Sequence, residues 1–479
     1  MLNHPQNYLE KLSPAQVEEI LTASLWVLEK TGLRVQDEPL WAEVLEKAGP
    51  GVMAGPDQRL RLKPEKALEL IALAPSEWRH EARRPENSRM LGGRRLCVVS
   101  GACGVFIVDW AGRRRYAGFE DFLRLTRLTQ ASPVMDICAH IPIEPSDVPV
   151  EYRPEVMTAG LLLSSDKPIM GMVTGAKAAA ASLEAAEIIL GDLSRAFWVL
   201  GLISINSPLL LEARMAEATR IYLQRGQPLL FASGTTMGVL GPVTLAGSLA
   251  QSFAELIGVV AMCQLIRPGH PVMIGNGGFC GNLRTGSTGY GRPEQALGFI
   301  LGAQMARRLK LPYRCTAGAT ASPAPDIQAA LEHTFTALGA WVAGPNFVFQ
   351  GAGVIDSINS MSYEQFVLDL EMWSYIQRLT RPVEIDDEHL PLDLIAQAPP
   401  SYLGHQHTLK HFRRELYEPI FGKRRKQGDM TVEEVAKERL AKIETETREI
   451  TPIDPTAAAE LKKYLAARQV PADFLEQHF

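Results

Sequence analysis

The sequence lacks the marks of a protein that is exported, crosses a membrane or binds nucleic acid. Residues 1–21 are polar and contain two prolines, unlike the basic start and apolar centre of a signal peptide. No uninterrupted apolar run reaches the length of about 18 residues that indicates a membrane span. The net charge of -5, without a basic arm, argues against a nucleic-acid partner. We therefore expect a cytoplasmic protein with neither a membrane nor a nucleic-acid partner.

Paired cysteines and a dinucleotide fingerprint are also missing. The six cysteines (97, 103, 138, 263, 280 and 315) are dispersed, none has CxxC spacing, and most lie in apolar runs. This pattern predicts buried thiols rather than a metal or redox site. No GxGxxG sequence follows an early strand-like run.

What the chain does contain is a regular alternation of short apolar runs and helical stretches. Seven runs are strand-like: Val134–His140, Pro168–Val173, Trp198–Ile205, Pro228–Ala232, Pro271–Asn276, Pro312–Thr316 and Asn346–Gln350. Their alternation with helices predicts an α/β fold with a parallel sheet. Even unit lengths favour a (β/α)8 TIM-type barrel over an open doubly wound sheet. The eighth strand is either Pro382–Ile385 or a run in the N-terminal segment.

The rest of the chain is predicted to flank a barrel at residues 134–385. Residues 1–133 suit a helical cap in which Arg94–Val99 and Val105–Asp109 form a β-hairpin. Residues 386–479 suit a helical extension, charged over 429–468, that wraps the barrel or contacts a partner.

The loops after the predicted strands are rich in small and neutral residues. The clearest is Thr316–Pro325, and the ionisable exceptions among these loops are His140 and Asp326. Barrel active sites lie at this end of the strands. Acid–base catalysis or a hydrolytic metal site would place His, Glu, Lys or clustered ligands there. The mouth of the barrel therefore suits the admission of a bulky reactant better than proton transfer.

Three motifs suggest other ligands, and each has a simpler explanation. His407 and His411, within His405–His411, are spaced to share a helix face and bind zinc, but no carboxylate partner is obvious. Asp387–Leu392 has Leu392 where the DxHxxG motif of cobalamin-binding domains has glycine. Gly275–Gly278 suits a tight loop better than a phosphate cradle. We predict structural packing for the histidines, a chance likeness for Asp387–Leu392, a tight loop for Gly275–Gly278, and no metal site.

A set of longer motifs spans nearly the whole chain. They are Leu28–Val35 (LEKTGLRV), Thr235–Gly247 (TTMGVLGPVTLAG), Gln264–Gly269 (QLIRPG), Pro325–Ala329 (PDIQA), Gln350–Gly353 (QGAG) and His405–Arg413 (HQHTLKHFR). Together they resemble the trimethylamine methyltransferase (MttB) superfamily of corrinoid methyltransferases. The resemblance implies a (β/α)8 barrel, in agreement with the strand pattern.

The resemblance also implies an activity. The founding members carry pyrrolysine in the loop after the sixth strand, at a position that matches Ala319 here. The chain therefore resembles the members without pyrrolysine, which act on quaternary amines such as glycine betaine, carnitine or proline betaine. Their methyl group passes to the Co(I) corrinoid of a separate corrinoid protein, so no cofactor is expected within this chain. A quaternary ammonium leaves as a neutral tertiary amine, which needs no acid.

The candidate binding residues follow from the chemistry of such a substrate. Ring faces attract a trimethylammonium group, and the candidate rings are Phe279, Tyr290, Tyr313 and Phe349. Gln350, and after it Asn276, are candidates to donate hydrogen bonds to a carboxylate tail. His140 and Ala319 complete the expected substrate-binding set, and no catalytic residue is assigned.

Two alternatives stay open from the sequence. One is a metal-dependent barrel lyase or hydrolase that uses His140, Asp326 or the histidine cluster. The other is a non-catalytic barrel paralogue that binds a small amine, suggested by Ala321–Pro323, where the family tends to have a polar stretch. The long C-terminal helix and apolar surface candidates lead us to expect a homo-oligomer.

Overall fold

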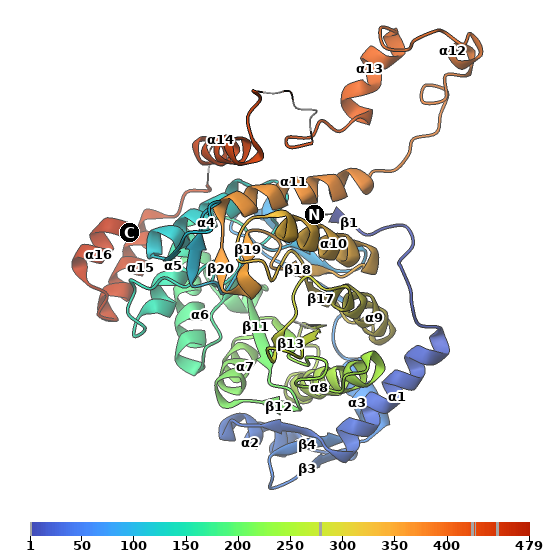
Figure 1. Cartoon of the computed structure of the whole chain (residues 1–479). Coiled ribbons are helices and arrows are strands. Elements are labelled where there is room, and N and C mark those ends of the chain that lie inside the picture. The colour runs from blue at the N-terminus through green and yellow to red at the C-terminus, as the bar shows by residue number, and fades with distance from the viewer. Residues whose placement is uncertain (1, 277–279, 423–425, 427, 447–449) are drawn as a thin grey trace.

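The computed structural model describes residues 2–276, 280–422, 426, 428–446 and 450–479. An eight-stranded sheet lies at the centre and helices surround it (Figure 1). Its strands are β1 (Leu2–Asn3), β7 (Arg95–Val98), β10 (Ile169–Gly171), β11 (Val199–Ile205), β13 (Leu229–Ser233), β14 (Val272–Asn276), β17 (Tyr313–Thr316) and β18 (Phe347–Phe349). Their order is β1-β7-β18-β17-β14-β13-β11-β10, and the pairings are parallel except that of β1 with β7. The predicted α/β class is confirmed.

β7 corrects the predicted hairpin. This strand pairs in parallel with β18, whereas β8 (Phe106–Val108) pairs with β9 (Arg114–Tyr116) and β20 (Ser360–Met361). Leu96–Val98 are all buried, which is typical of a strand covered on both faces. The hairpin prediction is therefore wrong, and the eighth strand comes from the N-terminal segment. Pro382–Ile385 lies outside any strand, and its Val383 is 86% exposed.

Residues 137–138 link β7 with β10, the last strand at the other end of the order. Val99, directly after β7, bridges Ile137 in parallel, and Cys138 bridges Ile169 at the start of β10. The buried ammonium of Lys167 holds the preceding turn, because its Nζ donates to the carbonyl oxygens of Thr129, Ser132 and Met135, each at 2.7 Å. The predicted strand Val134–His140 is therefore not formed; this segment contains two isolated β-bridges, at Ile137 and Cys138.

Seven helices alternate with residues 137–138 and the strands from β10 onward, as the sequence pattern predicts. They are α5 (Arg153–Ser164), α6 (Ala176–Leu190), α7 (Ala213–Arg225), α8 (Leu245–Ile266), α9 (Pro293–Leu309), α10 (Ile327–Ala343) and α11 (Tyr363–Leu379). Caps explain where some begin: the Asp326 carboxylate accepts from the Ala329 amide and starts α10. By length and composition α8 is apolar enough to cross a membrane, yet 78% of its most apolar window is buried in the fold. This burial is typical of a core helix.

The N-terminal segment packs helices and a small sheet against α8. Its helices are α1 (Pro14–Lys30), α2 (Glu38–Lys47) and α3 (Pro64–Ile71), and Ser13 caps the start of α1. A four-stranded sheet joins β12 (Leu210–Leu211), β2 (Leu33–Val35), β4 (Arg59–Leu62) and β3 (Val52–Ala54) in that order. Two strands, β5 (Glu77–His80) and β6 (Arg89–Gly92), and the helix α4 (Phe119–Ala131) complete the segment.

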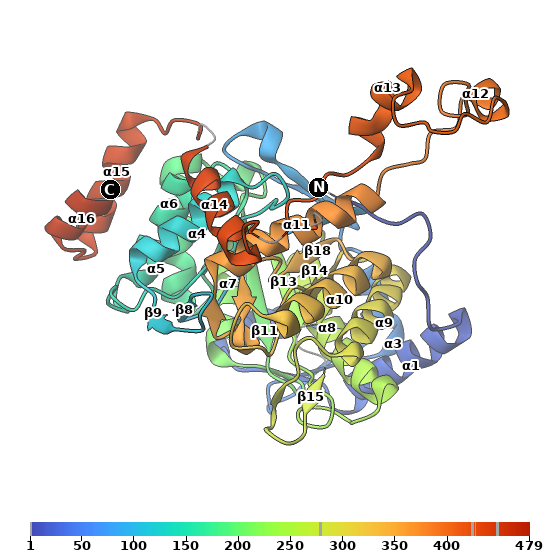
Figure 2. The same ribbon diagram turned by 45° about the horizontal axis from the view of Figure 1, so that its top comes forward.

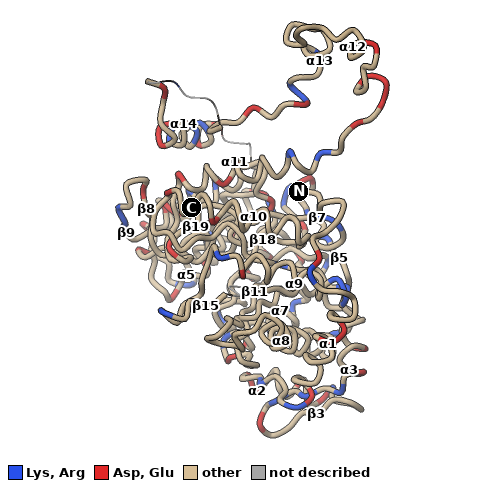
Figure 3. Tube along the Cα trace, turned by 45° about the vertical axis from the view of Figure 1, so that its right-hand side comes forward, with Lys and Arg blue, Asp and Glu red and all other residues tan. Residues whose placement is uncertain are grey.

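The C-terminal region divides into a projecting part and a packed part. After α11 the chain leaves the body, forms α12 (Leu392–Ala396) and α13 (Gln406–Glu415), and returns (Figures 1 and 2). We call residues 382–416 the arm. Three later helices pack on the body: α14 (Val432–Thr445) on α4 and α11, and α15 (Pro455–Ala467) with α16 (Ala472–His478) beside α5 and α6. Charges of both signs are interspersed along the arm and the outer helices (Figure 3).

Alternation along the strands separates two buried cores. The outer core lies between sheet and helices and takes residues such as Ile203, Phe231, Ile274 and Cys315. The inner core lies on the concave face of the curled sheet and comprises Cys97, Val99, Ile137, Met170, Leu200, Leu202, Leu230, Ala232, Met273, Phe347 and Phe349 among others. Functional side chains at the carboxyl ends of the strands would lie above this inner core.

Candidate functional site

Arg314 lies on the concave face of the sheet, in the middle of β17. Its neighbours Tyr313 and Cys315 belong to the outer core, so the two-residue period of the strand turns Arg314 inward. Gly275, its partner in β14, makes room for it: a Cβ there would lie 2.9 Å from Cβ and Cδ of Arg314. Nη1 of the guanidinium donates to the backbone carbonyl of Asn276 at 2.9 Å.

The guanidinium of Arg314 is buried without a counter-ion. The residue is 5% exposed and its Nε has no hydrogen-bond partner. Within the described part of the chain, no carboxylate pairs with it, and the ionisable groups that act on it are thiols and phenols. Burial lowers the pKa of Arg314, but a guanidinium stays charged in proteins. An uncompensated buried charge is costly, and such sites are candidates for binding an anion.

The ring of Phe349 lies beside this cation. The Cζ atom of Arg314 lies 5.0 Å from the ring centre of Phe349. His140 stacks on the same ring, with 6.1 Å between centres and 11° between planes. Burial lowers the pKa of His140 to about 4, so its imidazole is neutral at pH 7, and its Nδ1 has no hydrogen-bond partner. The hydroxyl of Thr316, two residues after Arg314, is likewise buried without a partner.

Tyr290 and Cys103 complete the surroundings of Arg314. Burial raises the pKa of Tyr290 to about 12, against the opposing effect of Arg314, so the phenol keeps its proton. Cys103 has a positive φ of 74° and is exposed, unlike the other five cysteines, which are buried as predicted. The site therefore combines one fixed cation, neutral polar groups and ring faces. Such a set can bind and orient a zwitterion, but it offers no acid or base at neutral pH.

The structure brings three of the predicted binding residues together and separates the others. Phe349 and Tyr290 lie near Arg314, and His140 stacks on Phe349. Tyr313 and Asn276 face the helices instead, because the Tyr313 hydroxyl donates to Asn276 Oδ1 at 3.0 Å and Asn276 Nδ2 donates to Ser252 of α8 at 2.5 Å. Phe279 lies outside the described residues.

Gln350 and Ala319 occupy the loops beside the site. The Gln350 side chain accepts from the Ala102 amide at 2.6 Å and donates to the Ala102 carbonyl at 3.0 Å. It thereby ties the loop after β18 to the loop after β7. Ala319 is fully buried and bridges Val354. The side-chain amides of Asn276 and Gln350 thus already bind other protein groups. Arg314, in contrast, has no carboxylate partner among the described residues.

Sequence reasoning missed Arg314 as a functional residue. Arg314 lies within the strand-like run Pro312–Thr316, where it is the charged residue. The signal was present, since a charge inside a strand of a sheet covered on both faces has no solvent to face. What was missing was the register, which decides whether the side chain points toward the helices or toward the concave face.

The metal-binding residues considered from the sequence lie elsewhere or have other roles. Asp326 caps α10. Glu384, Asp386 and His389 form the metal-compatible group found among the described residues. This group belongs to the arm, which projects from the body rather than lying at the ends of the strands (Figure 1). Neither Asp326 nor this group contributes a ligand beside Arg314.

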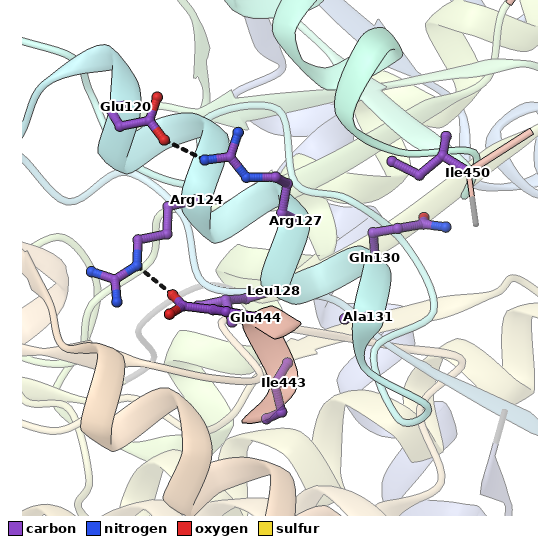
Figure 4. Close-up of a pocket in the computed structure, with 9 residues that line it drawn as sticks. All are labelled: Glu120, Arg124, Arg127, Leu128, Gln130, Ala131, Ile443, Glu444 and Ile450. Atoms are coloured by element: carbon purple, nitrogen blue, oxygen red, sulfur yellow. Dashed lines mark hydrogen bonds and ion pairs between the residues drawn. The ribbon is translucent and has the colours of Figure 1, made fainter. Parts of the chain in front are cut away.

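A separate cavity lies between α4 and α14 (Figure 4). It has a volume of about 250 Å³ and is lined by Glu120, Arg124, Arg127, Leu128, Gln130, Ala131, Ile443, Glu444 and Ile450. Ion pairs of Arg127 with Glu120 and of Arg124 with Glu444 flank it. None of these lining residues comes from a loop after a strand of the central sheet, so this cavity is distinct from the Arg314 site.

The chain is similar in sequence to known methyltransferases. The family described as trimethylamine methyltransferase (MTTB) matches residues 1–472. Glycine betaine methyltransferase of Desulfitobacterium hafniense (strain Y51) is 31% identical, over 95% of this chain and 96% of its own length. Proline betaine:corrinoid methyltransferase of Eubacterium limosum is 27% identical over 63% and 65% of the two chains.

A solved structure shares the fold. The crystal structure of the Methanosarcina barkeri monomethylamine methyltransferase (MtmB) aligns with a TM-score of 0.52 over 91% of this chain and 89% of that one. The sequence identity of 11% limits this likeness to architecture.

Proposed function

The chain belongs to the trimethylamine methyltransferase family, and we propose that it transfers a methyl group from a carboxylated quaternary amine of the glycine betaine type to the corrinoid of a separate protein. The observation that carries the choice of substrate is the buried guanidinium of Arg314, which has no carboxylate partner among the described residues. A betaine brings a carboxylate to this cation, whereas trimethylamine has none. Relatives named for glycine betaine and proline betaine support the same class.

The zwitterion fits the charge pattern of the site. Its carboxylate pairs with Arg314 in a charge-assisted, fork-like contact, for which arginine is well shaped. Its trimethylammonium group lies against the face of Phe349, beside neutral His140. Because the carboxylate neutralises the guanidinium, the substrate ammonium meets little net repulsion. Arg314 thus takes the role that the sequence led us to expect of Gln350 and Asn276.

The chemistry asks for positioning rather than proton transfer. When the partner is bound, its corrinoid supplies a strongly nucleophilic cobalt at the mouth of the site. The residues of this chain hold the methyl group in line and keep water away, which can supply much of the rate enhancement. The carbon–nitrogen bond breaks with its electron pair on nitrogen, so a neutral tertiary amine leaves without a proton. Neutral His140 and Tyr290 are compatible with this step.

We also propose that the curled sheet is a closed (β/α)8 barrel, completed by residues 137–138 between β7 and β10. The bridges at Val99 and Cys138 support this closure. The loops after the strands then surround one mouth, and Ala319 in one of them matches the pyrrolysine position of the founding members. Apolar side chains exposed by 39–65% in the loops after β13 and β14, namely Val239, Leu240, Val243 and Leu283, are where we place the contact with the corrinoid protein.

The direct test is methyl transfer from a panel of amines. Purified protein is mixed with a Co(I) corrinoid protein, or with free cob(I)alamin, and glycine betaine, choline or trimethylamine, and methyl-Co(III) is followed by absorbance. We expect kcat/KM for glycine betaine to exceed that for choline on the order of 30-fold or more. Choline lacks the carboxylate, and losing one partner of a buried charge pair costs about 2 kcal/mol or more. Equal rates with choline would contradict the role of Arg314, and no methylation by any quaternary amine would contradict the proposed activity.

The ring of Phe349 should contribute to substrate affinity. Phe349→Leu keeps an apolar side chain but removes the ring face, so we expect KM for glycine betaine to rise about 2- to 30-fold, the range of a cation–π contact worth 0.5–2 kcal/mol. Phe231→Leu is the matched control, because Phe231 of β13 is a fully buried ring of the outer core, on the side of the sheet that faces the helices. A KM that rises equally in both variants would argue against a specific ammonium contact.

A further inference from the structure

The arm, residues 382–416, leaves the body and returns to it at the same helix. Its returning end is tied to α11, because Arg378 donates to the Glu415 carbonyl at 2.8 Å and Arg381 donates to the Arg414 carbonyl at 2.9 Å. Just beyond, the Tyr417 hydroxyl donates to Glu371 at 2.9 Å. Figures 1 and 2 show α12 and α13 held away from the rest of the molecule in both views. The arm is therefore a fixed excursion with two anchored ends.

The polar groups of the arm pair with one another. His389 lies 2.7 Å from Asp386 and 3.1 Å from Glu384, Lys410 lies 2.9 Å from Glu388, and Arg414 pairs with Glu384. The rings of His389 and His411 are 5.3 Å apart, and those of His407 and His411 are 4.5 Å apart. Of the histidines in the HQHTLKH motif, His411 is buried, His407 is half-buried and His405 is exposed, and His411 Nε2 lies 3.3 Å from a carboxylate oxygen of Glu388.

Many apolar side chains of the arm are exposed to solvent. The exposed fractions are 62% for Leu409 and 69% for Leu416 on or beside α13, 68% for Leu392 on α12, and 83% for Leu403 between them. Val383, Ile385, Leu390, Ile395, Tyr402 and Phe412 are also exposed. Globular proteins normally bury such residues and expose the charged ones. So many exposed apolar side chains on one projecting segment are typical of a surface that binds another protein.

A second uncovered apolar face lies on the body, next to the base of the arm. On α10, Ile327, Leu331, Phe335 and Leu338 recur every three or four residues and are between 41% and 88% exposed. This spacing places them on one side of the helix. A groove of about 350 Å³ runs between α10 and α11, and its apolar lining includes Leu338, Met372, Ile376, Leu379 and Phe421.

We propose that the arm of one copy of this chain packs on the α10–α11 face of a second copy, and that the exchange is reciprocal. Both surfaces belong to the same chain, and a two-fold axis lets each copy give an arm and receive one. The anchored ends direct the arm away from its own α10, so a copy does not cover its own face. Helical apolar ridges on α12, α13 and α10 suit ridge-into-groove packing.

The need for a lasting partner favours a second copy over the corrinoid protein. A corrinoid protein that delivers and collects methyl groups must dissociate, and each dissociation would expose both surfaces to water again. Obligate interfaces between identical chains are large and apolar, like a core cut in half. The two surfaces described here have that character.

The test compares an arm variant, a face variant and a control by light scattering after size-exclusion chromatography. Leu409→Glu places a charge on the arm, Leu331→Glu places one on α10, and Leu45→Glu, at a position 49% exposed on α2, is the matched control. Wild type and control should have at least twice the mass of one chain. Each of the other variants should raise the dissociation constant for self-association more than about 100-fold, because the added charge is buried at both symmetric contacts.

Mixing separates this proposal from unfolding and from other partners. In a mixture of Leu409→Glu and Leu331→Glu, the intact arm of one variant meets the intact face of the other, so association should return as a mixed pair. Circular dichroism checks that both variants are folded. A wild-type protein with the mass of one chain would overturn the proposal. Variants that keep the full mass of the wild type would also overturn it, and this holds even if they lose binding of the corrinoid protein. A mixture of folded variants that fails to associate would overturn it as well.

Discussion

Replacing Arg314 with glutamine should remove most of the activity on glycine betaine while making the protein more stable. The substrate carboxylate loses its buried partner, a loss of about 2–5 kcal/mol that lowers kcat/KM on the order of 30- to 4,000-fold. The unliganded protein loses an uncompensated buried charge, so its unfolding temperature should rise rather than fall. Steady-state methylation of the corrinoid and thermal unfolding with and without glycine betaine measure the two effects.

The controls for this variant separate charge from shape. Arg314→Lys keeps a cation but loses the planar fork, so an intermediate loss is expected. Choline carries the same trimethylammonium group without a carboxylate, and its low rate should change little in Arg314→Gln. Equal losses with glycine betaine and choline would mean that Arg314 shapes the site without pairing with the carboxylate. A stabilising effect of glycine betaine that survives in Arg314→Gln would also contradict the assignment.

Replacing Lys167 with methionine should cost about 3–5 kcal/mol of stability, since breaking a buried polar cluster leaves its remaining members unsatisfied. The Lys167 ammonium satisfies three buried carbonyls in the turn that leads to residues 137–138. Methionine fills similar space but donates to none of them. Denaturant unfolding should therefore begin at a lower concentration, and the bridges at Val99 and Cys138 should lose hydrogen-exchange protection first.

Lys177→Met is the matched control for this substitution. Lys177 is exposed on α6 and donates to a single carbonyl, that of Glu151, at 2.9 Å. Exposed substitutions of this kind usually change stability by about 0.5 kcal/mol or less. Similar shifts in both variants would show that the three carbonyls find water or other donors when Lys167 is lost.

The sequence predicted the periodic part of the fold and failed where one strand had to be assigned from its partners. From Pro168 onward, each strand-like run and the helix after it appear in the structure, because apolar period and Gly/Pro punctuation are local signals. β7 is also strand-like locally, but nothing in residues 95–98 says that its neighbour is β18, about 250 positions further on. The short apolar run after it made a hairpin the simplest local solution, and tertiary pairing overrode it.

The same limit applies to the site. Phe349, His140 and Tyr290 could be proposed from residue type and from their place in or after strands. Tyr313 and Asn276 carry equally suitable groups but face α8 and α9, a difference set by register alone. Gln350 was proposed for its amide, which the structure uses to join two loops. The position of Arg314 depends on the same register, because its neighbours in β17 point toward the helices and Arg314 therefore points toward the concave face.

The inner core has a consequence for the order in which reactants arrive. Met170, Leu200, Leu230, Met273 and Phe347 are fully buried on the concave face and fill it toward the amino ends of the strands. In the closed barrel that we propose, these side chains block entry from that side, so the amine and the corrinoid would share the opening at the carboxyl ends. This arrangement predicts that the small amine binds first, because the larger reactant would then cover the opening. It also predicts that the corrinoid protein leaves before the demethylated amine is released.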